Sequence, residues 1–238
     1  MGVENRAAFT AVIGATGTGK GVLVKTRLLT PIPARLLVWD PMEEYGNVGR
    51  VVGLSEMARI AKEEGSFRLV FQPDWDDDKR NRQFELFCGI AFAAHDCTAL
   101  VEELSLVTKP SWAPPKWRRL SNMGRHKGVQ VIATAQRPAQ VDKAFLGAAT
   151  TIYCNRLIYP EDARVLSKFL GVTDGEIMAL PDLHYIALDV RTREVTRGVS
   201  SIPRLRASQK MAEKTPKSKK TSATPPRETP GNPGKHGM

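Results

Sequence analysis

Residues 14–21 read Gly-Ala-Thr-Gly-Thr-Gly-Lys-Gly and directly follow the apolar stretch 7–13, Ala-Ala-Phe-Thr-Ala-Val-Ile. Glycines at these spacings let the backbone fold tightly and turn its N–H groups toward a phosphate, and Lys20 adds a positive charge near the β- and γ-phosphates. The strand-like stretch before this loop and the helix-like stretch 22–29 after it argue against a chance match, because a phosphate-binding loop joins a strand to a helix N-terminus. The sequence therefore predicts a nucleoside triphosphate as the ligand.

All eight loop residues are candidate phosphate-binding residues: Gly14, Ala15, Thr16, Gly17, Thr18, Gly19, Lys20 and Gly21. Gly21 departs from the usual pattern, in which a serine or threonine hydroxyl at this position ligates Mg²⁺. We expect Gly21→Ser to leave nucleotide binding intact and to tighten metal binding. A loss of binding in that variant would indicate that the glycine serves backbone geometry instead.

Paired carboxylates follow another apolar stretch, because Glu102 and Glu103 come directly after the strand expected at 98–101. A strand of a parallel sheet that ends in this way places them at the carboxyl edge, beside the phosphate loop. Glu102 is then the candidate metal ligand, and Glu103 the candidate residue that positions and activates the attacking water. The competing interpretation is a solvated helix start, where paired glutamates are also common.

Two further polar residues are candidates for catalysis. Gln136 follows the strand expected at 129–134, where it would contact the γ-phosphate or the water; as a strand cap it would instead bond to local backbone. Arg125 belongs to the basic stretch 118–127, which suits the negative end of a helix dipole. The sharper hypothesis is that an arginine here reaches the nucleotide of a neighbouring subunit.

The rest of the chain alternates between strand-like and helix-like segments, which predicts an α/β fold with a mostly parallel sheet. Strands are expected at 8–13, 35–39, 67–71, 98–101, 129–134, 150–154 and 185–190. Helices are expected at 20–29, 55–64, 79–94, 116–127, 160–170 and 173–179. Several strands are continuously apolar, as expected where helices cover both faces of the sheet.

The length of 238 residues and the hydrophobic content of 42% suit one folded domain, expected at 1–202, followed by a tail at 203–238. The tail holds nine Lys or Arg against two Glu, so most of the chain's net charge of +10 lies there. It is poor in large apolar residues, and we expect it to be disordered. Such a tail either contacts the phosphates of nucleic acid or is a solvated extension.

Targeting signals are not evident in the sequence. No stretch of about 18 apolar residues is present, so no membrane span is expected. The first residues lack the pattern of a signal peptide, and three scattered cysteines in apolar surroundings indicate reduced thiols. These features favour a cytosolic protein.

Taken in order, five stretches resemble the FtsK/HerA superfamily of P-loop DNA-translocating ATPases: 14–21, 37–46, 101–103, 124–128 and 133–138. The second contains Asp-Pro-x-x-Glu-Tyr, which is similar to a HerA pattern, and the last, Ala-Thr-x-Gln-Arg-Pro, is similar to FtsK. The resemblance extends over about residues 8–190.

The resemblance implies a RecA-like core, a ring that is usually a hexamer, and ATP hydrolysis with Mg²⁺ that moves double-stranded DNA through a central channel. It places Lys20 on the phosphates, Glu102 on the metal, Glu103 on the water and Gln136 in sensing. Arg125 matches an arginine finger acting across subunits, and Arg137 and Arg156 are weaker candidates. Glu102 stands where the family usually has Asp. This departure and the one at Gly21 bear on the rate of ATP hydrolysis more than on nucleotide binding.

Within the superfamily, the small size and the missing anchor resemble the genome-packaging ATPases of viruses. The leading hypothesis is therefore a translocase that packages a phage genome, with a capsid vertex or portal protein as docking partner, in the host cytoplasm or on the virion. The alternative is a nucleotide-binding assembly factor, similar to the Zot-like proteins of filamentous phages, that does not translocate double-stranded DNA. A small-molecule kinase fits less well, because no phosphate-acceptor signature is apparent.

Overall fold

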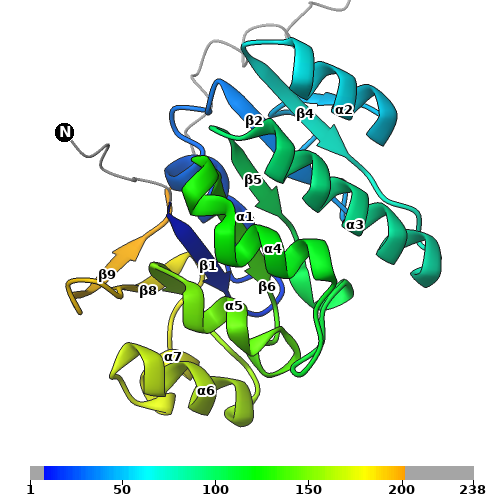
Figure 1. Ribbon diagram of the computed structural model, residues 1–238. Helices are drawn as coiled ribbons and strands as arrows, with labels where there is room; N and C mark the ends of the chain where they lie inside the picture. Colours follow the sequence, from blue (N-terminus) through cyan, green and yellow to red (C-terminus); the bar gives the residue numbers. More distant parts are fainter. Residues whose placement is uncertain (1–7, 202–238) are drawn as a thin grey trace, which may run out of the picture. The chain divides into compact units, whose positions relative to one another are not determined.

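The computed structural model describes residues 8–201, and the fold is that of these residues. Their strands form one nine-stranded sheet in the order β3-β4-β2-β5-β6-β1-β7-β8-β9 (Figure 1). The strands are β1 Phe9–Ile13, β2 Arg35–Trp39, β3 Arg50–Val51, β4 Phe67–Phe71, β5 Thr98–Val101, β6 Gln130–Ala135, β7 Thr151–Cys154, β8 His184–Asp189 and β9 Val195–Val199. All neighbours from β3 to β7 pair in parallel, and β8 and β9 are added antiparallel.

Helices connect the parallel strands. They are α1 Lys20–Leu23, α2 Leu54–Glu63, α3 Asp77–Ala94, α4 Pro115–Met123, α5 Lys143–Ala148, α6 Pro160–Leu170 and α7 Asp174–Met178. A π-helical segment, η1 Val24–Leu28, continues α1, and three 3₁₀ segments complete the set: η2 Leu104–Leu106, η3 Gly124–Lys127 and η4 Pro138–Gln140. The predicted helix at 20–29 therefore forms, as an α-helical turn followed by a wider π turn.

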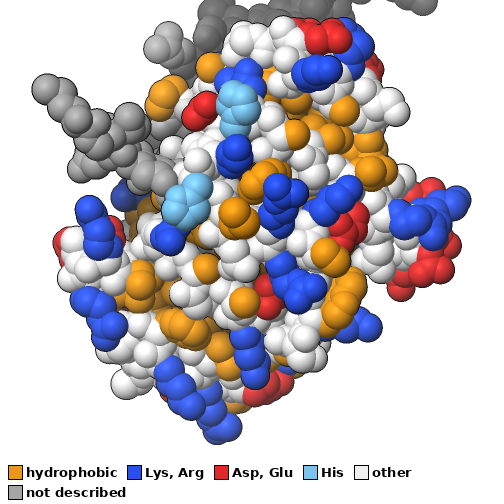
Figure 2. Space-filling model, viewed as in Figure 1, with side chains coloured by type: hydrophobic (Ala, Val, Ile, Leu, Met, Phe, Trp, Pro, Cys, Tyr) orange, Lys and Arg blue, Asp and Glu red, His pale blue; other side chains and the backbone are white. Residues whose placement is uncertain are grey.

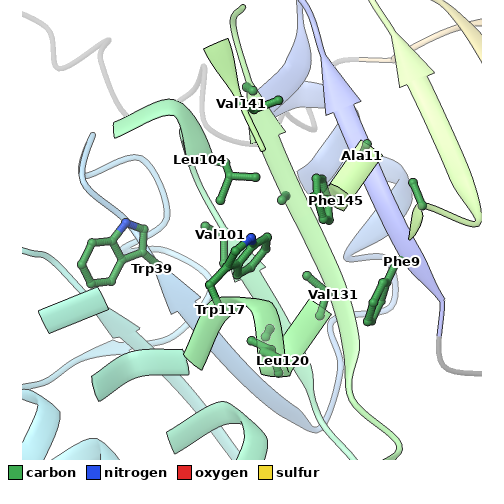
Figure 3. Packing of buried hydrophobic residues seen from close by; sticks show 14 of the residues in the cluster. Phe9, Ala11, Trp39, Val101, Leu104, Trp117, Leu120, Val131, Val141 and Phe145 are labelled. Atoms are coloured by element: carbon green, nitrogen blue, oxygen red, sulfur yellow. The ribbon is translucent and has the colours of Figure 1, made fainter. Parts of the chain in front are cut away.

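Apolar side chains fill both faces of the sheet. Alternation along β1 sends Phe9, Ala11 and Ile13 into one hydrophobic cluster and Val12 into another, since successive side chains of a strand point to opposite faces. On the first face lie α3, α4 and α5, in front of the sheet in Figure 1. Figure 3 shows Trp117 of α4 and Phe145 of α5 beside side chains of the strands, such as Val131 of β6.

The opposite face is covered by α1 and η1. Leu23 and Val24 are fully buried there and pack in one cluster with Val38 of β2 and Tyr45 from the loop after β2. Both faces are therefore closed to water, which explains why the central strands are continuously apolar rather than alternating.

The prediction of an α/β fold with a mostly parallel sheet is confirmed. Elements that the sequence did not reveal are β3, α5 and β9. The tail predicted at 203–238 lies outside the described residues, as does its expected boundary at residue 202. Within residues 8–201, no helix combines the length and apolar character needed to cross a bilayer.

The strand order determines where the site lies. The strand that precedes the phosphate loop, β1, pairs with β6 and β7, and β6 separates it from β5. Because these strands are parallel, their carboxyl ends meet at one edge of the sheet. This arrangement brings the loop 14–21, the carboxylates after β5 and Gln136 after β6 to the same edge.

Candidate nucleotide-binding site

The phosphate loop connects β1 to α1, as the sequence predicts. Gly17 and Gly19 adopt φ values of 76° and 110°, which side chains other than glycine rarely tolerate. Thr18 is buried, and its hydroxyl donates to the carbonyl oxygen of Ala15 at 2.7 Å. The loop is thus held in a tight turn by its own residues.

Neighbouring segments support the loop from behind. A Cβ on Gly14 would lie 2.7 Å from the Cβ of Asn155, so only glycine fits there. The amide of Asn155, fully buried after β7, donates to the carbonyl oxygens of His184 at 2.8 Å and Thr18 at 3.4 Å. Sequence reasoning missed Asn155, because no local pattern distinguishes this residue.

Lys20 lies over the loop. Its Nζ donates to the carbonyl oxygens of Gly14 at 2.8 Å and Ala15 at 3.2 Å. Burial lowers the pKa of Lys20, and the carboxylates of Glu103 and Glu102 act against this change. The ammonium group is therefore positioned between the loop and the acidic residues, where a phosphate could take the place of the two carbonyl oxygens.

Glu103 is held at the end of β5 in a left-handed conformation, with φ 49° and ψ 65°. Its backbone N–H donates to the hydroxyl of Thr134 on β6 at 3.0 Å. The carboxylate oxygen Oε1 accepts hydrogen bonds from the hydroxyl of Ser105 and from the backbone N–H of Gln136, the latter at 3.2 Å. Both bonds go to one oxygen, so they orient the carboxylate while Oε2 is left for another partner.

Gln136 connects this carboxylate to the phosphate loop. Its backbone N–H contacts Glu103, and its side-chain oxygen accepts from the hydroxyl of Thr16 at 2.7 Å. Since β6 lies between β1 and β5, a residue at its end reaches both neighbours. The structure therefore brings together the predicted loop residue Thr16, the predicted base Glu103 and the predicted sensor Gln136.

Glu102, the predicted metal ligand, lies on the other side of the β5 end. The residue is 8% exposed, and its Oε2 has no hydrogen-bond partner within residues 8–201. Burial, followed by interaction with the carboxylates of Asp40 and Glu44, raises the pKa of Glu102 to about 9. Burial disfavours the ionised form of this carboxylate, and a bound cation would favour it.

The loop after β2 contributes a further acidic group. Asp40 is fully buried, and its carboxylate accepts from the backbone N–H groups of Glu44 and Tyr45, both at 2.9 Å. This turn brings the side chain of Glu44 to Gly21, where a Cβ would lie 2.9 Å from Glu44 Oε2. Sequence reasoning included these residues in the resemblance but assigned Glu44 no role.

The residues present fit Mg²⁺. Within residues 8–201, no three His, Cys, Asp or Glu side chains form a preformed metal cage. Mg²⁺ in a nucleotide site needs fewer protein ligands, because one or two carboxylates together with phosphate oxygens and waters usually hold it. The unpartnered Oε2 of Glu102 and the carboxylate at Gly21 supply oxygen ligands of this kind.

The structure separates Arg125 from this edge. Arg125 is exposed on η3, which precedes β6, and it lines a cavity with Phe9 and Thr150 at the amino ends of β1 and β7. The five residues of β1 therefore lie between Arg125 and the loop of the same chain, a span of roughly 16 Å at the usual rise per residue. Arg125 is not part of the site within one chain.

The two weaker candidates, Arg137 and Arg156, have other partners. Arg137 pairs with Asp162 and Glu161 of α6, both at 2.8 Å, and lies over the ring of Tyr159. Arg156 follows β7 near the loop and pairs with Asp182 at 2.6 Å. Arg137 thus joins α6 to the sheet edge, while Arg156 forms part of the wall behind the loop.

A separate hollow, of about 1010 Å³, lies over α2, α3 and α4. Its lining includes the half-exposed Leu86 together with Ile90, and basic groups such as Lys116 border it. Figure 2 shows apolar side chains on this face of the molecule, with basic ones beside them. None of the predicted nucleotide-site residues lines this hollow.

Comparison with known proteins identifies the family. No protein-family model matches the chain. Over 176 residues the chain is 30% identical to Protein P9 of Pseudoalteromonas phage PM2. The aligned region covers 72% of this chain and 79% of that protein. The chain belongs to the Protein P9 family.

The fold of this P9-family chain is also found in solved structures. The genome packaging NTPase B204 of Sulfolobus turreted icosahedral virus 2, in complex with AMPPCP, has a TM-score of 0.66 and 18% identity, covering 82% of this chain and 98% of that one. VirB4 of Thermoanaerobacter pseudethanolicus has a TM-score of 0.67 and 11% identity, covering 85% of this chain and 92% of that one. The resemblance to FtsK/HerA-type P-loop ATPases is confirmed at the level of the fold.

Proposed function

We propose that this protein is an ATP-hydrolysing DNA translocase that packages a viral genome. The observation that carries the proposal is the chain of contacts from Thr16 of the phosphate loop through Gln136 to Glu103. A translocating motor needs such a connection, because the presence of the γ-phosphate has to be communicated to the rest of the domain. The fold shared with B204, described as a genome packaging NTPase, supports the packaging role.

The residues of the site have distinct tasks in this proposal. The loop amides and Lys20 bind the β- and γ-phosphates, and Mg²⁺ held by Glu102 neutralises phosphate charge when it is bound. Glu103 accepts a proton from the attacking water through its Oε2, while the hydrogen bonds to Oε1 keep the carboxylate oriented. Gln136 contacts the γ-phosphate or the water and changes its bond to Thr16 when the phosphate leaves.

Arg125 acts in a neighbouring subunit. Its place at the amino edge of the sheet suits a ring in which that edge faces the phosphate loop of the next copy, and the arginine there stabilises transition-state charge. We propose a homo-hexamer with double-stranded DNA in its channel. A capsid vertex or portal protein is the proposed docking partner, so that the protein works in the host cytoplasm or on the virion.

ATP turnover with and without double-stranded DNA tests the proposal. The wild-type protein is expected to hydrolyse ATP with Mg²⁺ and to do so faster with DNA. Glu103→Gln keeps the size and polarity of the side chain but cannot accept the proton, and it is expected to bind ATP while turnover falls by at least about 100-fold. Tight ATP binding without DNA-stimulated turnover would favour the alternative, a nucleotide-binding phage assembly factor.

A further inference from the structure

At the start of α1, the carboxylate of Glu44 lies beside Gly21, in the space that a side chain at position 21 would need. A Cβ built on Gly21 would meet Glu44 Oε2 at 2.9 Å, closer than real Cβ atoms approach an oxygen, and the hydroxyl of Tyr45 would lie 4.0 Å away. Gly21 does not have the left-handed backbone that favours glycine. The backbone therefore does not require glycine here, whereas a side chain at this position would oblige the Glu44 carboxylate to move.

The turn after β2 holds the backbone of Glu44 beside the start of α1. The backbone N–H of Glu44 and that of Tyr45 donate to the buried carboxylate of Asp40. The ring of Tyr45 is fully buried and lies 4.8 Å from Nζ of Lys25, so the turn is also packed against the helix that follows the phosphate loop. The Glu44 side chain itself is exposed and hence accessible to a ligand in the phosphate loop.

Two neighbouring polar atoms point to the same ligand. Within residues 8–201, Oε2 of Glu102 and the hydroxyl of Tyr45 are buried and have no hydrogen-bond partner. Nine buried side-chain atoms of residues 8–201 lack a partner, and these two are among those that lie near the phosphate loop, where an ion or water would satisfy them. Both lie near the start of α1 together with Glu44, and three carboxylates of this edge (Glu44, Glu102 and Glu103) act on Lys20.

We infer that Glu44 supplies the Mg²⁺ ligand that the serine or threonine hydroxyl supplies in other phosphate-binding loops. This inference rests on the proposed nucleotide site and specifies its metal ligands: Glu44 from the loop after β2 and Glu102 from the end of β5. Carboxylates are preferred Mg²⁺ ligands, and these two would hold the ion together with phosphate oxygens and waters. Gly21→Ser alone does not then improve the site, because the new side chain has to displace Glu44.

The test measures affinity for a fluorescent ATP analogue on the full chain, once with Mg²⁺ and once with EDTA. Glu44→Gln is expected to weaken binding by about 10-fold or more with Mg²⁺ and to leave binding in EDTA unchanged. Glu43→Gln is the matched control, since this exposed neighbour loses the same charge without lying at Gly21. The double variant Gly21→Ser, Glu44→Ala restores the usual hydroxyl. It is expected to recover the tighter binding of the ATP analogue with Mg²⁺ than with EDTA.

Mn²⁺ in place of Mg²⁺ provides a second readout, because the electron paramagnetic resonance spectrum of the bound ion changes when a protein ligand is lost. Equal Mg²⁺ dependence and equal Mn²⁺ spectra in wild type, Glu44→Gln and Glu43→Gln would overturn the inference and leave the proposed function standing. A wild-type protein that binds no nucleotide in either buffer would overturn the proposed function itself. Unchanged binding in EDTA shows that each variant is folded.

Discussion

Single contacts explain why particular residues occur in the phosphate loop. Gly14 is needed because Asn155 packs against its backbone, whereas Gly21 leaves room for the Glu44 carboxylate. The two glycines look alike in the sequence, but different neighbours lie against them. The expectation that Gly21→Ser tightens metal binding does not consider Glu44, a residue 23 positions further along the chain.

At this scale, Gly14→Ala is expected to destabilise the loop. The new Cβ would lie 2.7 Å from the Cβ of Asn155 and 3.0 Å from the hydroxyl of Thr18, so the backbone has to move. Overpacking of this kind costs about 1–3 kcal/mol, and nucleotide affinity is expected to fall because the loop amides shift. Urea unfolding and binding of a fluorescent ATP analogue measure the two effects.

Gly65→Ala is the control for this substitution, because a Cβ there has no atom within 4 Å. Gly65→Ala is expected to leave the free energy of unfolding and the nucleotide affinity nearly unchanged. Equal effects of the two substitutions would contradict the role given to the contact between Gly14 and Asn155.

Much of the site could be predicted from sequence, and the reason is geometric. Glu103 and Gln136 follow apolar strands of a parallel sheet, so their positions at one edge follow from the strands alone. Asn155 and Glu44 could not be placed, because their contacts depend on how two loops fold against the phosphate loop. The departure at Gly21 showed only that the usual hydroxyl ligand of Mg²⁺ is missing.

At the scale of elements, the apolar strands were predictable and the sheet edges were not. Strands β2, β4 and β5 have the predicted bounds, because continuous apolar stretches mark strands buried on both faces. β3 has only two residues, both exposed, and the residues of β9 are half-buried or exposed. Pairing with a neighbour, rather than the amino-acid pattern, makes these two segments strands.

The N-terminus of α3 offers a test at this scale. The side chain of Asp76 accepts from the backbone N–H of Lys79 at 2.9 Å and caps the helix. Asp76→Ala is expected to lower the free energy of unfolding by about 1 kcal/mol, measured in urea. Asp76→Asn keeps the acceptor and is expected to cost clearly less; an equal loss in both variants would indicate that charge, not the cap, is responsible.

At the scale of the whole molecule, two of the proposed catalytic residues lie at opposite edges of the sheet. Glu103 lies at the carboxyl edge with the phosphate loop, and Arg125 lies at the amino edge. One chain therefore cannot bring both to the same nucleotide, and the proposed ring is what would complete the site.

Mixing two inactive variants tests this division. Glu103→Gln and Arg125→Ala are each expected to lose ATP turnover, because one lacks the base and the other lacks the arginine. In mixed rings, an Arg125→Ala subunit next to a Glu103→Gln subunit has its own base and receives the arginine of its neighbour. Turnover is therefore expected to reappear on mixing, and a mixture as inactive as its components would contradict catalysis across subunits.

The most direct test of the central claim is movement along DNA. A third strand bound to a double-stranded DNA fragment is displaced by a protein that translocates through it, and the release of a fluorescent third strand reports each passage. We predict displacement by the wild-type protein with ATP and Mg²⁺, and none by Glu103→Gln or with a non-hydrolysable ATP analogue. Steady ATP turnover on this DNA without displacement of the third strand would contradict the account.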